Sequence, residues 1–481
     1  MKKLITLILA AAMLLPCAAC KKDDSGADGD MPTLKWIVPS DPESGWKDVV
    51  EALNVQLAEK LGCKIDMQII DASAYSEKLK LMMSSGEDFD LCYTSGTDFT
   101  DAVQKGGLLK LDDYIADSNI TDNVPADVIE YGRFGDGIYA IPNNQILAYQ
   151  PSVYIRQNLA DEYGLDVSKI KSLEDIEPFL KWVKENKTEY YPLRLTNNTI
   201  GIQADYADTF YDEFVSNAVY GVQNADGTVT VKKATDVPGF WELAELKNDW
   251  FKKGYIRSDV ATVYGDDWDD VNNGKYAVYT STYKPGGIEG NNSRFPDMPY
   301  CEAIISAPYR SYFAAGGTMT SINKNSKNPE LAFKFLELVN SDPDVYNLYA
   351  YGVEGKHYTR GEDGKVTINP DGGYAMNHGW KYGNQFNAYV MENQPDDVWE
   401  KTEELNEKAV LSLLTGFKPD LSDVKLEISQ ITTVNGKYSS VERGYNEVAS
   451  YKEAYLKDME AAGVNKVVEI LQKQVDEFLK K

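Results

Sequence analysis

The sequence predicts an α/β protein, and three observations support this class. From residue 33 onward, short apolar runs alternate with helical periodicity, a pattern typical of strands joined by helices. A second set of such signals follows residue 149, beyond a hairpin-like turn at Asp136-Gly137. Residues 395–481 carry mostly helical periodicity. The chain of 481 residues is long enough for two α/β bodies with a helical C-terminal extension.

The first α/β body is predicted from alternating strand and helix signals near the N-terminus. The strand-like runs are residues 34–38, 64–70 and 89–94. Three strands joined by two crossover helices predict a parallel βαβαβ sheet. Ligands of such sheets bind beyond the carboxyl ends of the strands. The loops at 39–46, 71–74 and 93–99 are therefore expected to face a binding site.

The second α/β body is predicted from the middle of the chain. A helix is expected over 172–186, because Ser172 and Asp175 have the spacing of a capping box. Asp226-Gly227 predicts a hairpin, and a further helix is expected from Pro238 to about Gly254. Residues 275–283 read as a strand that ends in a loop. Beyond it, Asn328 and Pro329 predict the start of another helix.

The N-terminus has the features of a secretory signal. Two lysines precede an apolar run at 4–15 that is too short to span a bilayer, and Ala18 and Ala19 precede Cys20. This stretch resembles a lipoprotein processing box, which implies cleavage after residue 19 and attachment of a diacylglycerol to Cys20. Residues 20–32 are charged and small, as in a flexible tether. We expect an anchor on the extracytoplasmic face of the cell membrane; an ordinary cleaved signal with an incidental Cys20 is the alternative.

The composition excludes some partners. The formal net charge is -26, and loss of the signal, with its two lysines and no acids, leaves -28. Nucleic acid is not an expected partner, because its contacts need a basic surface. Tyrosine outnumbers phenylalanine 32 to 15, so hydroxyl-bearing rings are favoured over the simpler core residue.

Cysteine and histidine give little support to metal or catalytic chemistry. Cys63, Cys92 and Cys301 remain after the signal and the lipidated cysteine are set aside. Their apolar or aromatic neighbours favour small core residues, although one disulfide pair stays open. Histidine occurs only at His357 and His378, and CxxC, HExxH and EF-hand patterns are absent from the sequence. We therefore expect no cofactor, no metal site and no Ser/His/Asp triad.

Several segments, in their order and spacing, resemble the solute-binding proteins of ABC importers, the family that includes the maltose-binding type. The matching stretches are FDLCYTSGTDFTDAVQKGGLLKLDDYI, GDGIYAIPNN, YAVYTSTY and GTMTSINKNSKNPELAFKFLELVNSDP. YGVEGKHY at 351–358 and the tail from 420 to 481 are further similar to a lipoprotein subgroup with a C-terminal domain of unknown function. The resemblance covers most of the chain.

The resemblance implies a two-lobe, periplasmic-binding-protein-like fold with discontinuous lobes that close on a solute. The expected division is 33–147 with 314–352 in the first lobe, and 148–313 with 353–481, including the helical tail 395–481, in the second. Crossings between lobes are expected near 145–150, 310–316 and 350–356. The resemblance also implies a monomer without enzymatic activity that delivers its solute to ABC permease subunits.

The expected solute is a saccharide. Its hydroxyls suit acidic and amide side chains, its apolar faces stack on aromatic rings, and the matched family binds mainly sugars. An oligopeptide or another polar solute is the alternative. An extracellular glycoside-acting enzyme is the competing class, but the 75 acidic residues do not single out a catalytic pair. An adhesin or scaffold would lack a closed polar cleft.

The candidate ligand-binding residues come from loops expected to face the cleft. They are Trp46, Tyr93, Asp98, Asn144, Tyr283, Glu354, Tyr358 and Trp380. Trp380 is the strongest stacking candidate, because it lies among glycines and polar residues rather than in a periodic apolar pattern. Each candidate also has a structural alternative. Trp46 lies on the apolar face of a predicted helix, Asp98 could cap one, and Glu354 and Tyr358 could simply order their loop.

Overall fold

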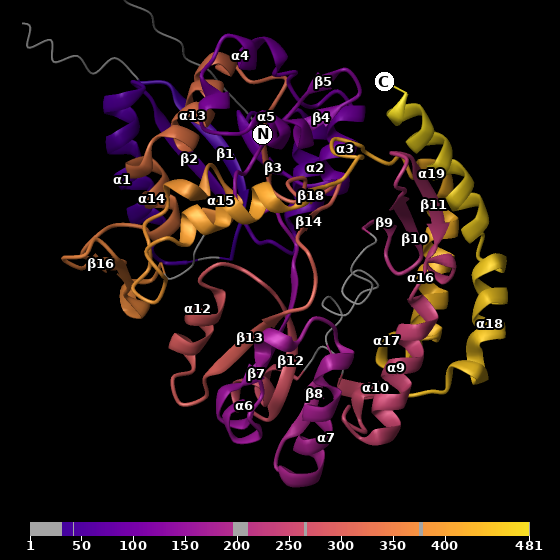
Figure 1. Ribbon diagram of the computed structural model, residues 1–481. Helices are drawn as coiled ribbons and strands as arrows, with labels where there is room; N and C mark the ends of the chain where they lie inside the picture. Colours follow the sequence, from indigo (N-terminus) through magenta and orange to yellow (C-terminus); the bar gives the residue numbers. More distant parts are fainter. Residues whose placement is uncertain (1–30, 42, 196–209, 264–266, 375–378, 481) are drawn as a thin grey trace, which may run out of the picture.

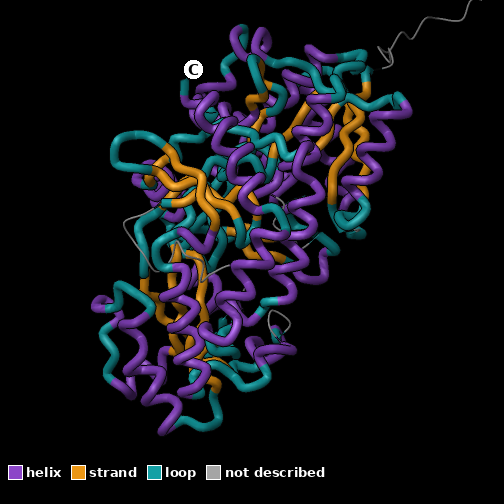
Figure 2. Tube along the Cα trace, turned by 90° about the vertical axis from the view of Figure 1, so that its right-hand side faces the viewer, coloured by secondary structure: helices purple, strands orange, loops and turns teal. Residues whose placement is uncertain are grey.

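The computed structural model describes residues 31–41, 43–195, 210–263, 267–374 and 379–480. The predicted signal peptide, Cys20 and most of the tether lie outside these residues. Figure 1 shows a first body at the top, a second below it, and a third along the right that contains the C-terminal helices. Figure 2 shows the strands gathered in separate groups, each flanked by helices. The predicted α/β class is confirmed.

The first body contains a five-stranded sheet in the order β2-β1-β3-β15-β6. β1, β2 and β3 run parallel, as the sequence predicts, while β15 lies antiparallel to both β3 and β6. The strand β15 comes from much later in the chain, so the first body is discontinuous in sequence. The bounds are β1 Thr33–Pro39, β2 Lys64–Ile70, β3 Leu91–Thr94, β6 Ile141–Pro142 and β15 Met319–Ile322.

Helices cover both faces of this sheet. On one face a core joins α1, α13 and α14 to the strands, and on the other α2 and α3 pack against Ile37, Phe89 and Cys92. Strands buried on two sides read as continuous apolar runs, which explains the sequence signal of β1 and β3, whose residues are mostly buried. The bounds are α1 Trp46–Lys60, α2 Tyr75–Ser85, α3 Gly96–Gln104, α13 Pro329–Ser341 and α14 Pro343–Tyr351.

The second body contains a four-stranded sheet in the order β13-β7-β12-β8. β12 pairs parallel with β8 and antiparallel with β7, and β7 pairs antiparallel with β13. Helices α6, α7 and α9 pack on one face around Phe179, Leu180 and Trp250. The bounds are β7 Pro151–Arg156, β8 Tyr191–Arg194, β12 Tyr276–Thr282, β13 Tyr300–Ile304, α6 Gln157–Tyr163, α7 Glu177–Asn186, α9 Phe240–Lys253 and α12 Gly287–Arg294.

The third body joins an antiparallel meander, β9-β10-β11, to the C-terminal helices. Tyr211 of the meander and Leu471 of the last helix are both fully buried in one shared core. The predicted Asp226-Gly227 hairpin is confirmed, since it connects β10 to β11. The bounds are β9 Tyr211–Val215, β10 Val219–Gln223, β11 Val229–Lys233, α16 Lys425–Lys437, α18 Val448–Ala461 and α19 Val464–Leu479.

Three segments cross between the first body and the rest. Tyr149 bridges Tyr309, and β14 (Tyr309–Arg310) pairs with β18 (Val410–Leu411). Asn406 joins the first crossing to the third. Its Oδ1 accepts from the backbone N–H of Leu147 at 2.8 Å and of Ala148 at 3.0 Å, and its Nδ2 donates to the carbonyl of Gln145 at 2.7 Å.

The expectation that the chain crosses near 350–356, with all of 353–481 in the second lobe, is wrong. Residues after α14 stay on the first body: Tyr374 and Tyr382 are buried in its core, and Tyr358 packs beside α14. The third crossing instead follows α15 (Val398–Lys408), at β18. The intervening segment has little periodicity and is held by single tyrosines, so its packing left no pattern in the sequence.

The remaining elements are short. They are α4 Asp112–Ala116, α5 Ala126–Ile129, α10 Val260–Val263, α11 Trp268–Asn272, α17 Ser440–Arg443, β4 Arg133–Phe134, β5 Gly137–Ile138, β16 Tyr358–Arg360 and β17 Val366–Ile368. Within the described residues, no helix has the length and apolar character needed to span a membrane. Cys63, Cys92 and Cys301 are free thiols, and the first two are fully buried.

Replacing Asn406 by alanine should lower the free energy of unfolding by about 1–3 kcal/mol, because two buried N–H groups would lose their acceptor. Urea unfolding measures the change. The matched control is Asn119→Ala, at an exposed asparagine, which should change stability by less than about 0.5 kcal/mol. Equal stability of the two variants would show that Asn406 does not hold the crossings together.

Candidate functional site

The carboxyl ends of the first sheet hold a short helical turn in place. β1 ends at Pro39 and β6 at Pro142, and the next residues, Ser40 and Asn143, are buried. Asn143 Nδ2 donates to the carbonyl of Trp380 at 2.6 Å and to that of Gly379 at 3.2 Å. The turn η7, Gly379–Lys381, is thereby fixed at the edge where ligands of parallel sheets bind.

Trp380 presents its side chain outward from this fixed turn. It is 43% exposed, whereas Trp36, Trp46 and Trp250 are at most 6% exposed. Among the tryptophans whose side chains the structure describes, it is the one in the exposed class. Because its backbone is anchored while its ring is accessible, it forms a rigid flat surface suited to stacking against a ligand ring.

Charged groups surround the turn. Lys381 Nζ donates to the carbonyl of Pro39 at 3.4 Å and lies 5.3 Å from the Trp380 ring. Burial lowers the pKa of Lys381, while Asp41 and Glu43 oppose that shift. Burial also raises the pKa of Glu43, against the effect of Lys381. These partly desolvated groups are positioned to exchange hydrogen bonds with a polar solute.

The second body supplies a polar and aromatic cluster on the sheet face opposite α6 and α7. The Tyr154 and Tyr279 rings lie 5.2 Å apart, and the Tyr279 hydroxyl donates to Asn291 Oδ1 of α12 at 3.1 Å. Tyr154 faces Glu302 across paired strands. Glu302 Oε1 is buried and has no hydrogen-bond partner in the part of the chain that the structure describes.

The environment of Glu302 disfavours its charged form. Burial raises the pKa of Glu302 to about 7, and Glu289 adds to the rise, while the neighbouring Ser152 hydroxyl opposes it. Such a carboxyl group is ready to form hydrogen bonds with a solute that enters this part of the molecule.

The structure brings part of the predicted site together. Trp380 lies at the carboxyl edge of the first sheet, and Tyr93 lies half-buried at the end of β3, with its hydroxyl donating to the carbonyl of Gly317 at 2.6 Å. Tyr283 belongs to the second body and lies near Glu302 and Lys401, whose charges act on its pKa: burial raises that pKa, Glu302 raises it further, and Lys401 lowers it.

Two predicted residues have structural partners close to this edge. Asn144 is buried, and its Nδ2 donates to the carbonyl of Asn123 and to Asn384 Oδ1, both at 3.2 Å. Trp46 is buried in the first core, with its ring 5.0 Å from that of Tyr374. Both residues hold loops together in this structure.

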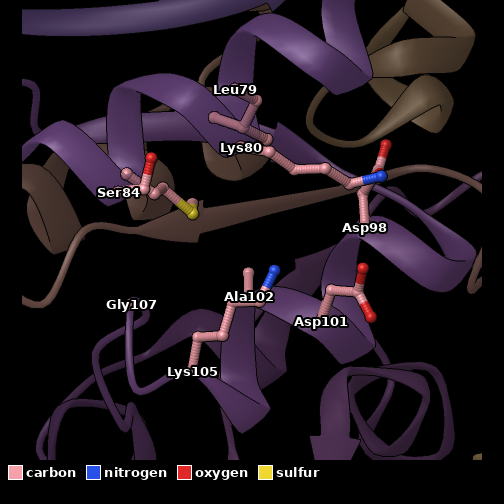
Figure 3. Close-up of a pocket in the computed structure, with 9 residues that line it drawn as sticks. Leu79, Lys80, Ser84, Asp98, Asp101, Ala102, Lys105 and Gly107 are labelled. Atoms are coloured by element: carbon pink, nitrogen blue, oxygen red, sulfur yellow. The ribbon is translucent and has the colours of Figure 1, made fainter. Parts of the chain in front are cut away.

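The other three predicted residues lie apart from Trp380. Asp98 is in the first turn of α3, where it accepts from Ser76 Oγ at 2.5 Å and pairs with Lys80 at 3.3 Å. Figure 3 shows it lining a groove between α2 and α3, with Lys80 extended toward it. Glu354 is exposed beside Arg360, and Tyr358 is buried against α14; both order the β16–β17 hairpin.

Sequence reasoning missed Asn143, Lys381 and Glu302. Asn143 stands next to the predicted Asn144 in a loop, where no periodicity tells which of two adjacent side chains points inward. Glu302 had a usable signal, since it interrupts the apolar strand 300–304 at a position that alternation assigns to one sheet face. Lys381 had none.

These features define a two-lobe binding protein whose candidate site lies at the edges of the sheets. The chain belongs to the bacterial extracellular solute-binding protein family, whose model matches residues 39–345. Residues 413–480 match a domain of unknown function, DUF3502. The predicted family, fold and subgroup are thereby confirmed, and the chain is a binding protein, not an enzyme.

Solute-binding proteins from other bacteria are similar to this protein over nearly the whole chain. A carbohydrate ABC transporter substrate-binding protein from Streptococcus pneumoniae is 26% identical over 99% of this chain and 97% of its own. The crystal structure of an N-glycan transport solute-binding protein from the same species has a TM-score of 0.82 at 25% identity, covering 94% of this chain and 99% of that one. An HMO-binding protein from Bifidobacterium longum infantis shares the fold, with a TM-score of 0.68 at 15% identity over 94% of this chain and 100% of that one.

Glu302→Gln should change how stability depends on pH. The carboxyl has its ordinary pKa of 4.5 in the unfolded chain and a pKa of about 7 in the folded protein, so the native state binds more protons between these values. The free energy of unfolding should therefore fall as pH rises from 4.5 to 7 and stay flat above. The glutamine variant should lack this fall and be more stable above pH 7 by about 1–2 kcal/mol, allowing for partial solvent screening.

Urea unfolding at the two ends of this pH window measures the effect, with Glu59→Gln as the control at an exposed position. The control should follow the wild-type profile. A Glu302→Gln profile parallel to the wild type would contradict a raised pKa at this site.

Proposed function

We propose that this protein captures a neutral saccharide between its lobes and delivers it to the permease of an ABC importer. The observation that carries the proposal is Trp380, an exposed ring on an anchored turn at the carboxyl edge of the first sheet. A sugar ring has an apolar face that suits such a surface. The names of the relatives, which transport or bind carbohydrates, support the same class of solute.

The hydroxyl groups of a bound sugar need fixed partners, because a desolvated hydroxyl without one is costly. Around Trp380, Asp41, Glu43 and Lys381 can supply them, and across the molecule Glu302 and Tyr283 can do the same. Micromolar affinity requires about 8 kcal/mol in total. One stacking surface and a few such hydrogen bonds can together contribute a binding free energy of this size.

Capture would involve movement of the lobes about the three crossings. In this proposal the first lobe comprises 33–147 and 314–408, and the second comprises 148–313 with the body that contains the C-terminal helices. The pneumococcal N-glycan relative supports a change of arrangement. Its complexes with Man1GlcNAc and Man5GlcNAc match this chain with TM-scores of 0.71 and 0.68, below the 0.82 found for its other structure.

The membrane anchor completes the proposal. A diacylglycerol on Cys20 would hold the protein at the extracytoplasmic face of the membrane, next to the permease. At about 0.8 kcal/mol per buried CH₂, two acyl chains suffice for stable retention. The tether of residues 20–32, which is rich in charged and small residues, would let the two lobes reach the permease while the protein stays attached to the membrane.

Trp380→Ala should weaken saccharide binding by about 1–3 kcal/mol, as loss of other flat-ring stacking does, with little change in ligand-free stability. A thermal-shift screen of sugars and peptides selects the ligand, and calorimetry measures its affinity. Trp182→Ala, a change at a partly buried ring of the second body, is the control and should leave affinity unchanged. Unchanged affinity in Trp380→Ala would reject the site, and a screen that yields only peptides would reject the sugar.

Cys20→Ala should leave the protein unprocessed or release it into the medium, because the acyl acceptor is gone. Fractionation of cells and medium, followed by mass spectrometry of the N-terminus, detects the change. Cys17→Ala is the control: Cys17 is within the predicted signal, so this variant should remain anchored. A processed Cys20→Ala protein that stays in the membrane fraction would rule out the lipid anchor.

A further inference from the structure

A cavity of about 280 Å³ lies where the first body meets the C-terminal part of the chain. One wall is α3, through Gly96, Thr100 and Asp101; a second is Tyr312 and Phe313; the third is the segment 418–425. Neither η7 nor the loop after β1 contributes to it. The cavity is therefore distinct from the site around Trp380.

Lys418 is the unusual residue of this cavity. Its Nζ is buried, and within the described ranges it has neither a hydrogen-bond acceptor nor an ion-pair partner. Its Nζ lies 5.8 Å from the centroid of the Phe99 ring. Burial lowers the pKa of Lys418 to about 8, so the ammonium form still dominates at neutral pH. A buried cation of this kind is costly unless something pairs with it.

Within the described residues, no other charged side chain of the cavity forms a hydrogen bond or ion pair with Lys418. Asp420 is exposed and accepts from the backbone N–H of Ser422 at 3.0 Å; this bond, and to a lesser degree Lys425, lowers the pKa of Asp420. Asp101 lies on α3, where it also borders the groove of Figure 3. Asp101, Asp420, Lys425 and Lys418 sum to zero formal charge, but among the described residues neither acid forms a hydrogen bond or ion pair with Lys418 Nζ, so its ammonium group has no direct partner.

The remaining wall is aromatic. Phe313 is 36% exposed, and Tyr312 beside it is packed edge-to-face against Phe214 with centroids 5.3 Å apart. The backbone of α3 approaches closely at Gly96, where an added Cβ would lie 3.5 Å from Phe313 Cζ. Phe313 thus lines the cavity with an accessible aromatic ring.

We propose that this cavity binds a small carboxylate with a ring-sized body, its carboxylate on Lys418 and its ring on Phe313. The volume of about 280 Å³ is just below the usual range for small-molecule sites and suits a single ring. A free aromatic or alicyclic acid and a uronic acid both present this chemistry. Because the walls come from the first lobe and from the chain just after two crossings, the shape of the cavity depends on how the lobes are arranged.

Calorimetric titration of the full chain with sodium phenylacetate and with sodium glucuronate tests the proposal. At least one of the two should bind saturably, and binding of the uncharged analogue of the first, 2-phenylethanol, should be weaker by about tenfold or more. Affinity should be nearly constant between about pH 6 and 7, where the acid is ionised, and should fall as the pH rises through about 8, because Lys418 then loses its proton. Absence of saturable binding by both acids at millimolar concentration would overturn the proposal.

Variants of the residues that line the cavity test whether the acid binds there. Lys418→Met keeps the length of the side chain without its charge and should weaken binding by about tenfold or more, as should Phe313→Ala. Lys105→Met, at an exposed lysine near the end of α3, is the control and should bind like the wild type. If Lys418→Met does not fold, as judged by its thermal melt, Phe313→Ala and the pH profile decide. Wild-type affinity in a folded Lys418→Met variant would refute the proposal.

A final arm separates this site from the saccharide site. Trp380→Ala should bind the carboxylate normally, and Lys418→Met should bind the screened saccharide normally. Carboxylate binding that is lost in Trp380→Ala but kept in Lys418→Met would place the acid in the saccharide site and would refute binding at the Lys418 cavity. Failure of saccharide binding alone would leave the carboxylate result standing.

Discussion

The carboxamide of Asn406 accepts two backbone N–H groups from one crossing segment and donates to a carbonyl of the same segment. Backbone groups that pass between bodies outside a sheet need partners, and buried ones that lack them are costly. By supplying those partners, Asn406 ties the first crossing to the third, and the pairing of β14 with β18 ties the third to the second. The relative positions of the bodies, and of any site between them, depend on this group of bonds.

The elements with regular apolar patterns could be predicted from the sequence. The parallel strands β1 and β3 are mostly buried, and β2 begins with alternating exposed and buried residues. The hairpin at Asp226-Gly227 needs a residue with positive φ, which Gly227 provides at 81°. The segment after α14 could not be placed. Tyr374 is held by contacts with residues far away in the chain, among them the bond from its hydroxyl to the carbonyl of Tyr349 at 2.6 Å and the ring of Trp46, and such contacts produce no periodic pattern in the sequence.

The candidate site was predictable to the extent that a residue stood outside any apolar pattern. Trp380 did, and it is exposed at a sheet edge; Trp46 did not, and it is core. Near Trp380, burial works against the charges of Lys381 and Glu43, and across the molecule it works against that of Glu302. Polar groups held partly out of water reduce the stability of the ligand-free protein, a cost that is common where a protein is prepared to bind.

The shared core of the meander and the C-terminal helices has an evolutionary consequence. The match to the solute-binding protein family ends at residue 345, and the match to the domain of unknown function begins at 413. Nevertheless, one core contains residues of both matches: Tyr211 and Val219 from the first, and Val467 and Leu471 from the second. The boundary between the two sequence families therefore runs through a single folding unit. Recombination at that boundary would pair two halves of a core that had not been selected together, so the two regions are expected to be inherited as one piece.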